Sequence, residues 1–359
     1  MIPTEPIGSI PRSDELVAAL AAEAAGSISG EELDALLAEA VRETIAEFEA
    51  TGSPVVTDGE QRKPSFASYP LHGLDSLSPE GVVIPFADGH TRQLPVLTKG
   101  PFQYATHAAS YLRSAQEVAS RPVKQAVISA SALSLLYPAG GLDGYSQQEF
   151  LDDLVDEAEA DIRGCLEAGA HSVQIDFTEG RLALKLDPSG GLLRQFVDLN
   201  NQVLDRFTDE ERARIGIHSC PGGDNDSTHS ADVDYEQLLP TLFDHRAAAF
   251  YLELAGEDDP ESVLRAIAAN LGPGQRVFVG VIDPIDPVIE TPEQVRDRVL
   301  LAAQHVALNQ LGTTDDCGFS PFFDNTSTTR DTAFAKIQTR VRGTALAEQF
   351  LGVSHGNDR

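Results

Sequence analysis

Cysteine is scarce in this sequence. The 359 residues contain three cysteines, Cys165, Cys220 and Cys317, at irregular spacing. So small a set does not form a disulfide framework, and it suits a reducing compartment in which cysteine serves a metal or a reaction. No hydrophobic run approaches the length of a membrane span, and residues 1–6 lack the basic and apolar regions of a secretory signal. We therefore expect a soluble, cytoplasmic protein with no membrane partner.

Basic residues are also in short supply. There are 26 Lys and Arg against 56 Asp and Glu, which gives a formal net charge of −30. Such a surface repels phosphate backbones and anionic lipid, so we expect no nucleic-acid partner, and it disfavours a highly anionic substrate unless a local basic pocket overrides it. A generally acidic proteome would give the same balance without functional meaning. The composition leaves a homo-oligomer open.

Short apolar runs alternate with helical periods along the chain, which favours an α/β architecture with parallel strands. Eight strand and helix units predict a single (β/α)8 TIM barrel domain spanning residues 1–359. The strands are expected at or near 6–12, 53–58, 123–129, 172–176, 215–217, 248–254, 276–282 and 310–313. Helices are expected at 29–50, 150–168, 192–207, 260–271 and 330–350, with one more that opens at Thr291-Pro292. Residues 81–103 alternate around Asp88-Gly89 and predict an inserted β-hairpin.

Zinc-type ligands stand at several of the expected strand ends. His218 and Cys220 lie one residue apart after a short apolar run, and Cys317 lies between an apolar stretch and a Gly/Ser/Pro loop. Glu253 places a carboxylate in an apolar strand, which is costly unless a positive group meets it. Because the C-terminal ends of barrel strands converge on one face, we expect a zinc ion held by these four residues, with Glu253 as the most replaceable ligand. Cysteine is also often a small buried hydrophobe, and this is our interpretation of Cys165.

Six motifs occur in the order found in the C-terminal catalytic barrel of cobalamin-independent methionine synthases. They are Ile7-Gly8-Ser9, Asp58-Gly-Glu60, Gln174-Ile-Asp176, His218-x-Cys220, Leu252-Glu253 and Asp316-Cys317-Gly318. The chain resembles that family over nearly its whole length. The resemblance implies a zinc-dependent transfer of a methyl group to homocysteine or a similar thiol, from a folate or methylcobalamin donor. It also implies that Ile7, Gly8 and Ser9 hold the carboxylate of homocysteine, while Glu60 and Asp176 bind its ammonium group.

The sequence departs from the family in ways that concern the methyl donor. The family's acid histidine after strand seven has no counterpart, and Asp283 stands in that region as a candidate acid. Tryptophan is absent, so Tyr137 is the candidate to stack on a cofactor. The segment 221–230 is a longer loop than the family usually has, and its His229 is a candidate for acid-base catalysis or an ordinary surface residue.

Two other functions remain open at this stage. The departures also resemble a divergent branch that includes epoxyalkane:coenzyme M transferases, which would imply a sulfonate thiol and cationic partners for it. The candidate cations are Arg12, Arg62, Arg181 and Lys185. A third possibility is a non-catalytic barrel in which four fixed ligands close a structural zinc site.

Overall fold

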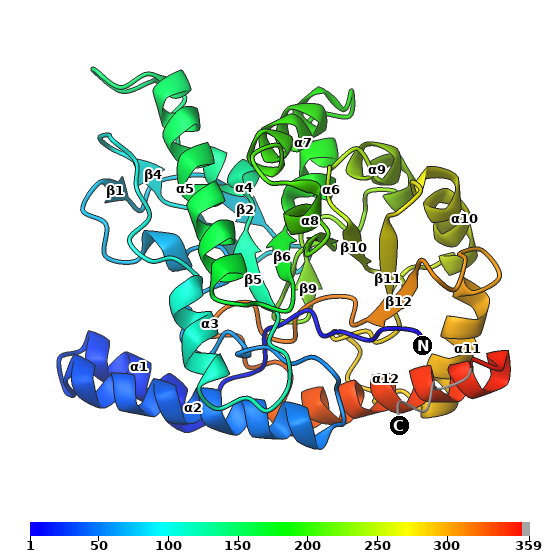
Figure 1. Ribbon diagram of the computed structural model, residues 1–359. Coiled ribbons are helices and arrows are strands. Elements are labelled where there is room, and N and C mark those ends of the chain that lie inside the picture. Colours follow the sequence, from blue (N-terminus) through cyan, green and yellow to red (C-terminus); the bar gives the residue numbers. More distant parts are fainter. Residues whose placement is uncertain (354–359) are drawn as a thin grey trace.

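A six-stranded parallel sheet forms the centre of the computed structural model, which describes residues 1–353 (Figure 1). Its strands lie in the order β12, β11, β10, β7, β6, β5. Their bounds are β5 Gln125–Ile128, β6 Val173–Asp176, β7 Ile215–Ser219, β10 Ala249–Leu252, β11 Arg276–Gly280 and β12 Leu311–Thr314. Six of the eight expected strands are thus confirmed, each within a few residues of its expected place.

The first two expected strands are each reduced to an isolated parallel bridge. Thr4 bridges to Thr313 beside β12, and Val56 bridges to Val123 just before β5, so the two segments continue the sheet at its two edges. A hydrogen bond of 3.0 Å from the Ile10 amide to the Gly59 carbonyl joins the segments to each other. Prolines at 3, 6 and 54 remove amide donors from these stretches, and such residues shorten a ladder. The result is a barrel-like fold with six regular strands.

Helices surround the strands, and those expected from the sequence are present (Figure 1). They are α2 Gly30–Ala50, α5 Gln147–Glu167, α7 Gly191–Leu204, α10 Pro260–Asn270, α11 Pro292–Ala302 and α12 Arg330–Leu351. Further helices were not expected: α1 Asp14–Ala24, α3 Ala109–Gln116, α4 Ala130–Ser134, α6 Glu179–Leu186, α8 Asp209–Arg212 and α9 Tyr235–Leu242. Within residues 1–353, no helix is long and apolar enough to cross a membrane.

Two small hairpins lie together beside the barrel. The hairpin expected within 81–103 is confirmed as β2 Val83–Pro85 paired antiparallel with β3 Thr91–Gln93. The second hairpin consists of β8 Gly223–Asp224 and β9 Ser227–Thr228. A hydrogen bond of 2.9 Å from the Ala87 amide to the Thr228 carbonyl joins the two hairpins. The loop after β7 is thereby fixed against the inserted hairpin.

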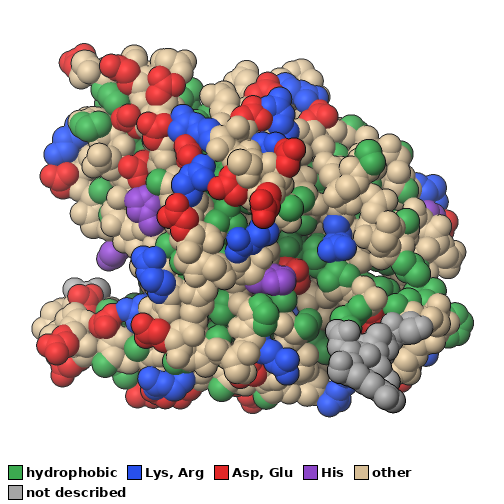
Figure 2. All heavy atoms as spheres, viewed as in Figure 1, with side chains coloured by type: hydrophobic (Ala, Val, Ile, Leu, Met, Phe, Trp, Pro, Cys, Tyr) green, Lys and Arg blue, Asp and Glu red, His purple; other side chains and the backbone are tan. Residues whose placement is uncertain are grey.

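The surface in view carries acidic and basic side chains side by side. Figure 2 shows Lys and Arg interspersed with Asp and Glu over this face, without a continuous basic area. This arrangement agrees with the net charge of −30 and offers no extended patch for a phosphate backbone on the face shown.

Candidate metal centre and substrate cavity

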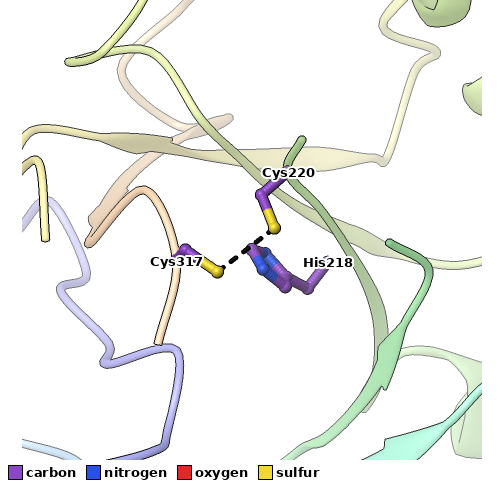
Figure 3. Close-up of side chains that lie close together, drawn as sticks. All are labelled: His218, Cys220 and Cys317. Atoms are coloured by element: carbon purple, nitrogen blue, oxygen red, sulfur yellow. Dashed lines mark hydrogen bonds between the residues drawn. The ribbon is translucent and has the colours of Figure 1, made fainter. Parts of the chain in front are cut away.

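Three of the expected zinc ligands come together at one point. His218 is on β7, Cys220 follows the end of that strand, and Cys317 follows β12, so the fold brings the ends of two distant strands together. The candidate ligand atoms of the three residues all lie within 4.8 Å of one another, and the side chains point toward a common centre (Figure 3). The two sulfurs are 3.2 Å apart, and both cysteines are free.

The hydrogen bonds of His218 leave one ring nitrogen available to a metal. Nδ1 lies 3.1 Å from the carbonyl oxygen of Tyr251, and because a carbonyl only accepts, Nδ1 carries the proton. Nε2 is buried and has no hydrogen-bond partner among the described residues. A backbone acceptor on one nitrogen and a free lone pair on the other is the usual state of a metal-ligating histidine. With two thiols beside it, this donor set fits zinc.

The two cysteines share a proton unequally. The hydrogen bond with the Cys220 thiol holds the pKa of Cys317 well below its usual range. The same contact, together with burial, raises the pKa of Cys220. Cys317 is therefore the more acidic of the two thiols, and metal binding is expected to release the thiol protons.

Glu253 lies beside this group without being part of it. The carboxylate follows β10, and its Oε2 lies 3.3 Å from Nη1 of Arg181. Burial raises the pKa of Glu253, and the nearby charges of Asp316 and Cys317 raise it further. The fourth expected ligand is therefore close enough to the sulfurs to interact with their charge, while its hydrogen-bonding partner is an arginine.

A cavity of about 270 Å³ opens next to His218 and Cys317. Its inner wall contains all the residues expected to bind the thiol amino acid: Ile7, Gly8, Ser9, Glu60 and Asp176. Its outer wall is largely apolar and comes from the inserted hairpin and two loops, with Ile84, Phe86, Leu94, Phe66 and Phe322. The hairpin was not among the expected parts of the site. The alternation of Ile84 and Phe86 was the available indication, because apolar side chains at every second residue form one face that must be covered.

Two carboxylates face the cavity and favour a cation there. Asp176 accepts a hydrogen bond of 2.7 Å from Gln174, and burial, with the charge of Glu60 adding to it, raises the pKa of Asp176 to about 6. Glu60 lies 2.9 Å from Nζ of Lys63, which neutralises one of the two charges. An ammonium group placed between Glu60 and Asp176 would balance the other.

Ser9 is in direct contact with the loop that carries Cys317. The Ser320 amide donates to Ser9 Oγ at 3.1 Å. A Cβ atom on Gly318 would lie 2.1 Å from the same oxygen, so only glycine fits between Cys317 and this contact. Ser9, which is expected to bind the carboxylate, and the loop of the expected metal ligand Cys317 therefore hold each other in place.

His229 is buried rather than on the surface, and it lines the cavity. The Ser230 hydroxyl donates to the Pro221 carbonyl at 3.0 Å, so at 2.8 Å it accepts from Nδ1 of His229 and leaves Nε2 as an acceptor. Burial, with the positive charges of Lys185 and Arg181, lowers the pKa of His229 to about 4. The ring is therefore neutral at pH 7 and does not carry the second proton that a general acid would donate.

Tyr137 and Asp283 lie outside the lining of this cavity. The Tyr137 hydroxyl donates to the Tyr145 carbonyl at 2.7 Å, and its ring packs on Phe150 with centroids 5.4 Å apart. The Asp283 carboxylate accepts from the Ile285 amide at 2.9 Å. Tyr137 therefore fixes local structure away from the cavity. Asp283 lies outside the cavity too, but on the side of Glu253 and Asp316, and its charge raises the pKa of Asp316.

The cations considered for a sulfonate are already engaged. Arg12 donates to the carbonyls of Glu60 and Lys63 at 2.6 and 2.8 Å. The remaining three pair with acidic side chains: Arg62 with Asp34, Arg181 with Glu253 and Glu257, and Lys185 with Asp232. None of the four is among the residues that line the cavity. The geometry therefore does not favour the coenzyme M alternative.

Comparisons with known proteins identify the family of this chain. Residues 2–339 match the family described as the catalytic domain of cobalamin-independent synthase. The chain is 25% identical over 350 residues to the uncharacterized protein YxjH of Bacillus subtilis, covering 92% of this chain and 91% of that protein. It is 22% identical over 354 residues to a methionine synthase of Sulfurisphaera tokodaii, covering 98% and 94%. The structure of a B12-independent methionine synthase from Shewanella sp. W3-18-1, in complex with selenomethionine, superposes with a TM-score of 0.76 at 18% identity, covering 99% of this chain and 100% of that one. The chain belongs to the family of cobalamin-independent synthase catalytic domains.

Proposed function

We propose that this protein is a methyltransferase that transfers a methyl group to the sulfur of homocysteine or a closely similar thiol amino acid. The observation that carries the proposal is the free Nε2 of His218 beside the two thiols, at the edge of a cavity with two carboxylates. These three residues would hold a zinc ion. Bound zinc lowers the pKa of a thiol that coordinates it, so that the thiol is a nucleophile at neutral pH.

The cavity supplies partners for each end of an amino acid. Glu60 and Asp176 would bind the ammonium group, because their combined charge is only partly balanced by Lys63. The segment Ile7-Gly8-Ser9 would bind the carboxylate, next to the loop of Cys317. The sulfur would then lie toward His218 and Cys317, with the methyl donor approaching from the apolar outer wall.

The site favours a donor without an anionic tail. Arg92 is the only Lys or Arg among the described lining residues, and both Asp224 and Asp324 pair with its guanidinium, at 2.5 and 2.8 Å. It is therefore not free to bind the carboxylates of a folate tail. A neutral His229 is also unsuited to protonate the amine that a methyl-folate releases. Of the two expected donors, we therefore favour methylcobalamin, whose leaving group needs no proton.

The test is a methyl-transfer assay with purified, metal-analysed protein. We expect methionine to form from homocysteine and methylcobalamin, and much more slowly from methyl-folate. Homocysteine should raise the melting temperature, and coenzyme M should not. Failure of homocysteine to bind to zinc-loaded protein would refute the proposal. If the visible spectrum of the cobalt-substituted protein does not change when any thiol is added, the metal would instead be structural.

A further inference from the structure

Arg181 joins the candidate metal centre to a second carboxylate. It lies on α6, is buried, and contacts Glu253 at 3.3 Å and Glu257 at 2.5 Å through its two terminal nitrogens. Its guanidinium lies over the ring of Tyr235, 4.2 Å from the centroid. The Tyr235 hydroxyl donates at 3.1 Å to the carbonyl of Ser219, the residue between the two ligands of the His-x-Cys motif. The arginine is therefore positioned relative to the metal ligands.

One guanidinium pairs with a buried carboxylate, Glu253, and a half-buried one, Glu257, and the two contacts are unequal. Glu257 is the closer partner of Arg181, and Glu253 the more distant one. Breaking a buried ion pair is usually costly because it leaves one charge unpaired. If Glu253 moved away from Arg181, Glu257 would still pair with the arginine. The buried Nε of Arg181 also lacks a hydrogen-bond partner among the described residues, so the guanidinium can adjust its contacts.

A zinc ion at the two sulfurs would give Glu253 a second positive partner. Without a metal, the charge of Glu253 raises the pKa of Cys220 and the charge of Cys317 raises the pKa of Glu253, so the carboxylate lies near the sulfurs and is repelled by them. A zinc ion at these sulfurs would attract it, while Arg181 holds it back. Arg181 contacts one oxygen of the carboxylate, Oε2, so the guanidinium and a metal would compete for the same negative charge.

We propose that Arg181 is a positioning residue that competes with the metal for Glu253. This inference rests on the proposed zinc site and names the residue that controls its fourth ligand. With Glu253 on Arg181, His218, Cys220 and Cys317 would hold the metal and leave a position for an incoming thiol. With Glu253 drawn to the metal, Glu257 would keep Arg181 paired and that position would be taken.

A double-mutant cycle separates this exchange from a simple charge effect. Removing a cation near a metal site strengthens metal binding even without any exchange, so Arg181→Met alone is ambiguous. We would measure zinc dissociation constants by chelator competition for the wild type, Arg181→Met, Glu253→Gln and the double variant. Exchange predicts that Arg181→Met tightens zinc binding by roughly tenfold or more, and by less than about twofold when Gln replaces Glu253.

A matched control is available on α5. Arg163 has a similar set of partners, with Glu159 and Glu211 each at 2.8 Å and the Phe207 ring 4.7 Å away, but it is on an outer helix and partly exposed. Arg163→Met should leave zinc affinity unchanged. Because Arg181→Met could impair folding, Glu257→Gln provides a milder change. Among the described residues it leaves Glu253 as the one acidic partner of Arg181, so it should weaken zinc binding only while Glu253 is present.

Cobalt spectroscopy gives an independent readout of coordination. In the wild type, homocysteine should change the visible spectrum of bound Co²⁺ by taking the open position, and in Arg181→Met the change should be smaller because Glu253 occupies that position. Equal tightening of zinc in the presence and absence of Glu253 would overturn the exchange and leave only a charge effect. Failure of the wild type and all variants to bind zinc would refute the zinc site itself, together with the exchange.

Discussion

The sulfurs of Cys220 and Cys317 lie 3.2 Å apart although 97 residues separate them in the chain. A disulfide needs a sulfur separation of about 2.05 Å, so a small movement would join them. We expect a mild oxidant to form this disulfide in metal-free protein and bound zinc to protect the pair. Intact mass and peptide mapping would check this. Cys165, buried in α5, should stay reduced in both forms, and its oxidation in preference to the pair would contradict the geometry.

Removing either cavity carboxylate should weaken homocysteine binding. A hydrogen bond to a charged group contributes about 1.5–3 kcal/mol, so Glu60→Gln or Asp176→Asn should raise the dissociation constant by roughly ten- to a hundredfold. Calorimetric titration of zinc-loaded variants measures this directly. Asp226→Asn, on an exposed turn of the β8–β9 hairpin, is the control and should bind as the wild type does. Normal affinity in both cavity variants would remove the proposed ammonium site.

Gly318→Ala should disturb the substrate end of the cavity. The added Cβ would lie 2.1 Å from Ser9 Oγ, so either Ser9 or the loop of Cys317 must move. We expect a loss of about 1–3 kcal/mol in unfolding free energy, the usual range for overpacking, together with weaker homocysteine binding. Chemical denaturation and titration would test both. At Gly140 a Cβ meets nothing within 4 Å, so Gly140→Ala should change neither quantity.

His245 should make stability depend on pH in a defined window. Burial lowers the pKa of His245 to about 4 from 6.5, and Nδ1 lies 2.9 Å from the Leu242 carbonyl. Between pH 6.5 and 4, His245 therefore binds a proton in the unfolded chain and stays neutral in the folded chain. The neutral ring costs no stability above pH 6.5, and stability falls as the pH drops from 6.5 toward 4.

The size of that effect is checked with His245→Gln. At about 1.4 kcal/mol per pKa unit, the single histidine accounts for roughly 3 kcal/mol across the window. The variant should lose less stability than the wild type between pH 6.5 and 4, whatever its absolute stability. Denaturation midpoints at several pH values give the comparison, and parallel curves for the two proteins would rule the assignment out.

Residues at strand ends were the part of the site that the sequence could predict. His218, Cys220 and Asp176 follow short apolar runs, and parallel strands deliver such residues to one face. The pairing of Arg181 with Glu253 was beyond sequence reasoning, because it joins a short, unexpected helix to a strand 72 residues away through side-chain packing alone. Tyr137 was chosen for its chemistry, and only the packing of its loop shows that it lies outside the cavity lining.

The fold, like the site, had parts that the sequence could predict and parts that it could not. Long helices with clear caps, such as α2 with its Ser29 and Glu32 capping box, were found from pattern alone. The two N-terminal strands shrank to bridges because proline interrupts their ladders, a local effect whose extent depends on the neighbouring strands. Helix α1 was missed although Ser13 caps it and alanine dominates it, and both features could have indicated it.

Metal analysis of the purified protein tests the central claim most directly. With zinc supplied during expression, the wild type should contain one zinc ion per chain, and Cys317→Ser should contain far less under the same conditions, since it loses one of three converging donors. Cys165→Ser should match the wild type. A wild-type protein that carries no zinc, or a Cys317→Ser variant that retains it fully, would contradict the account.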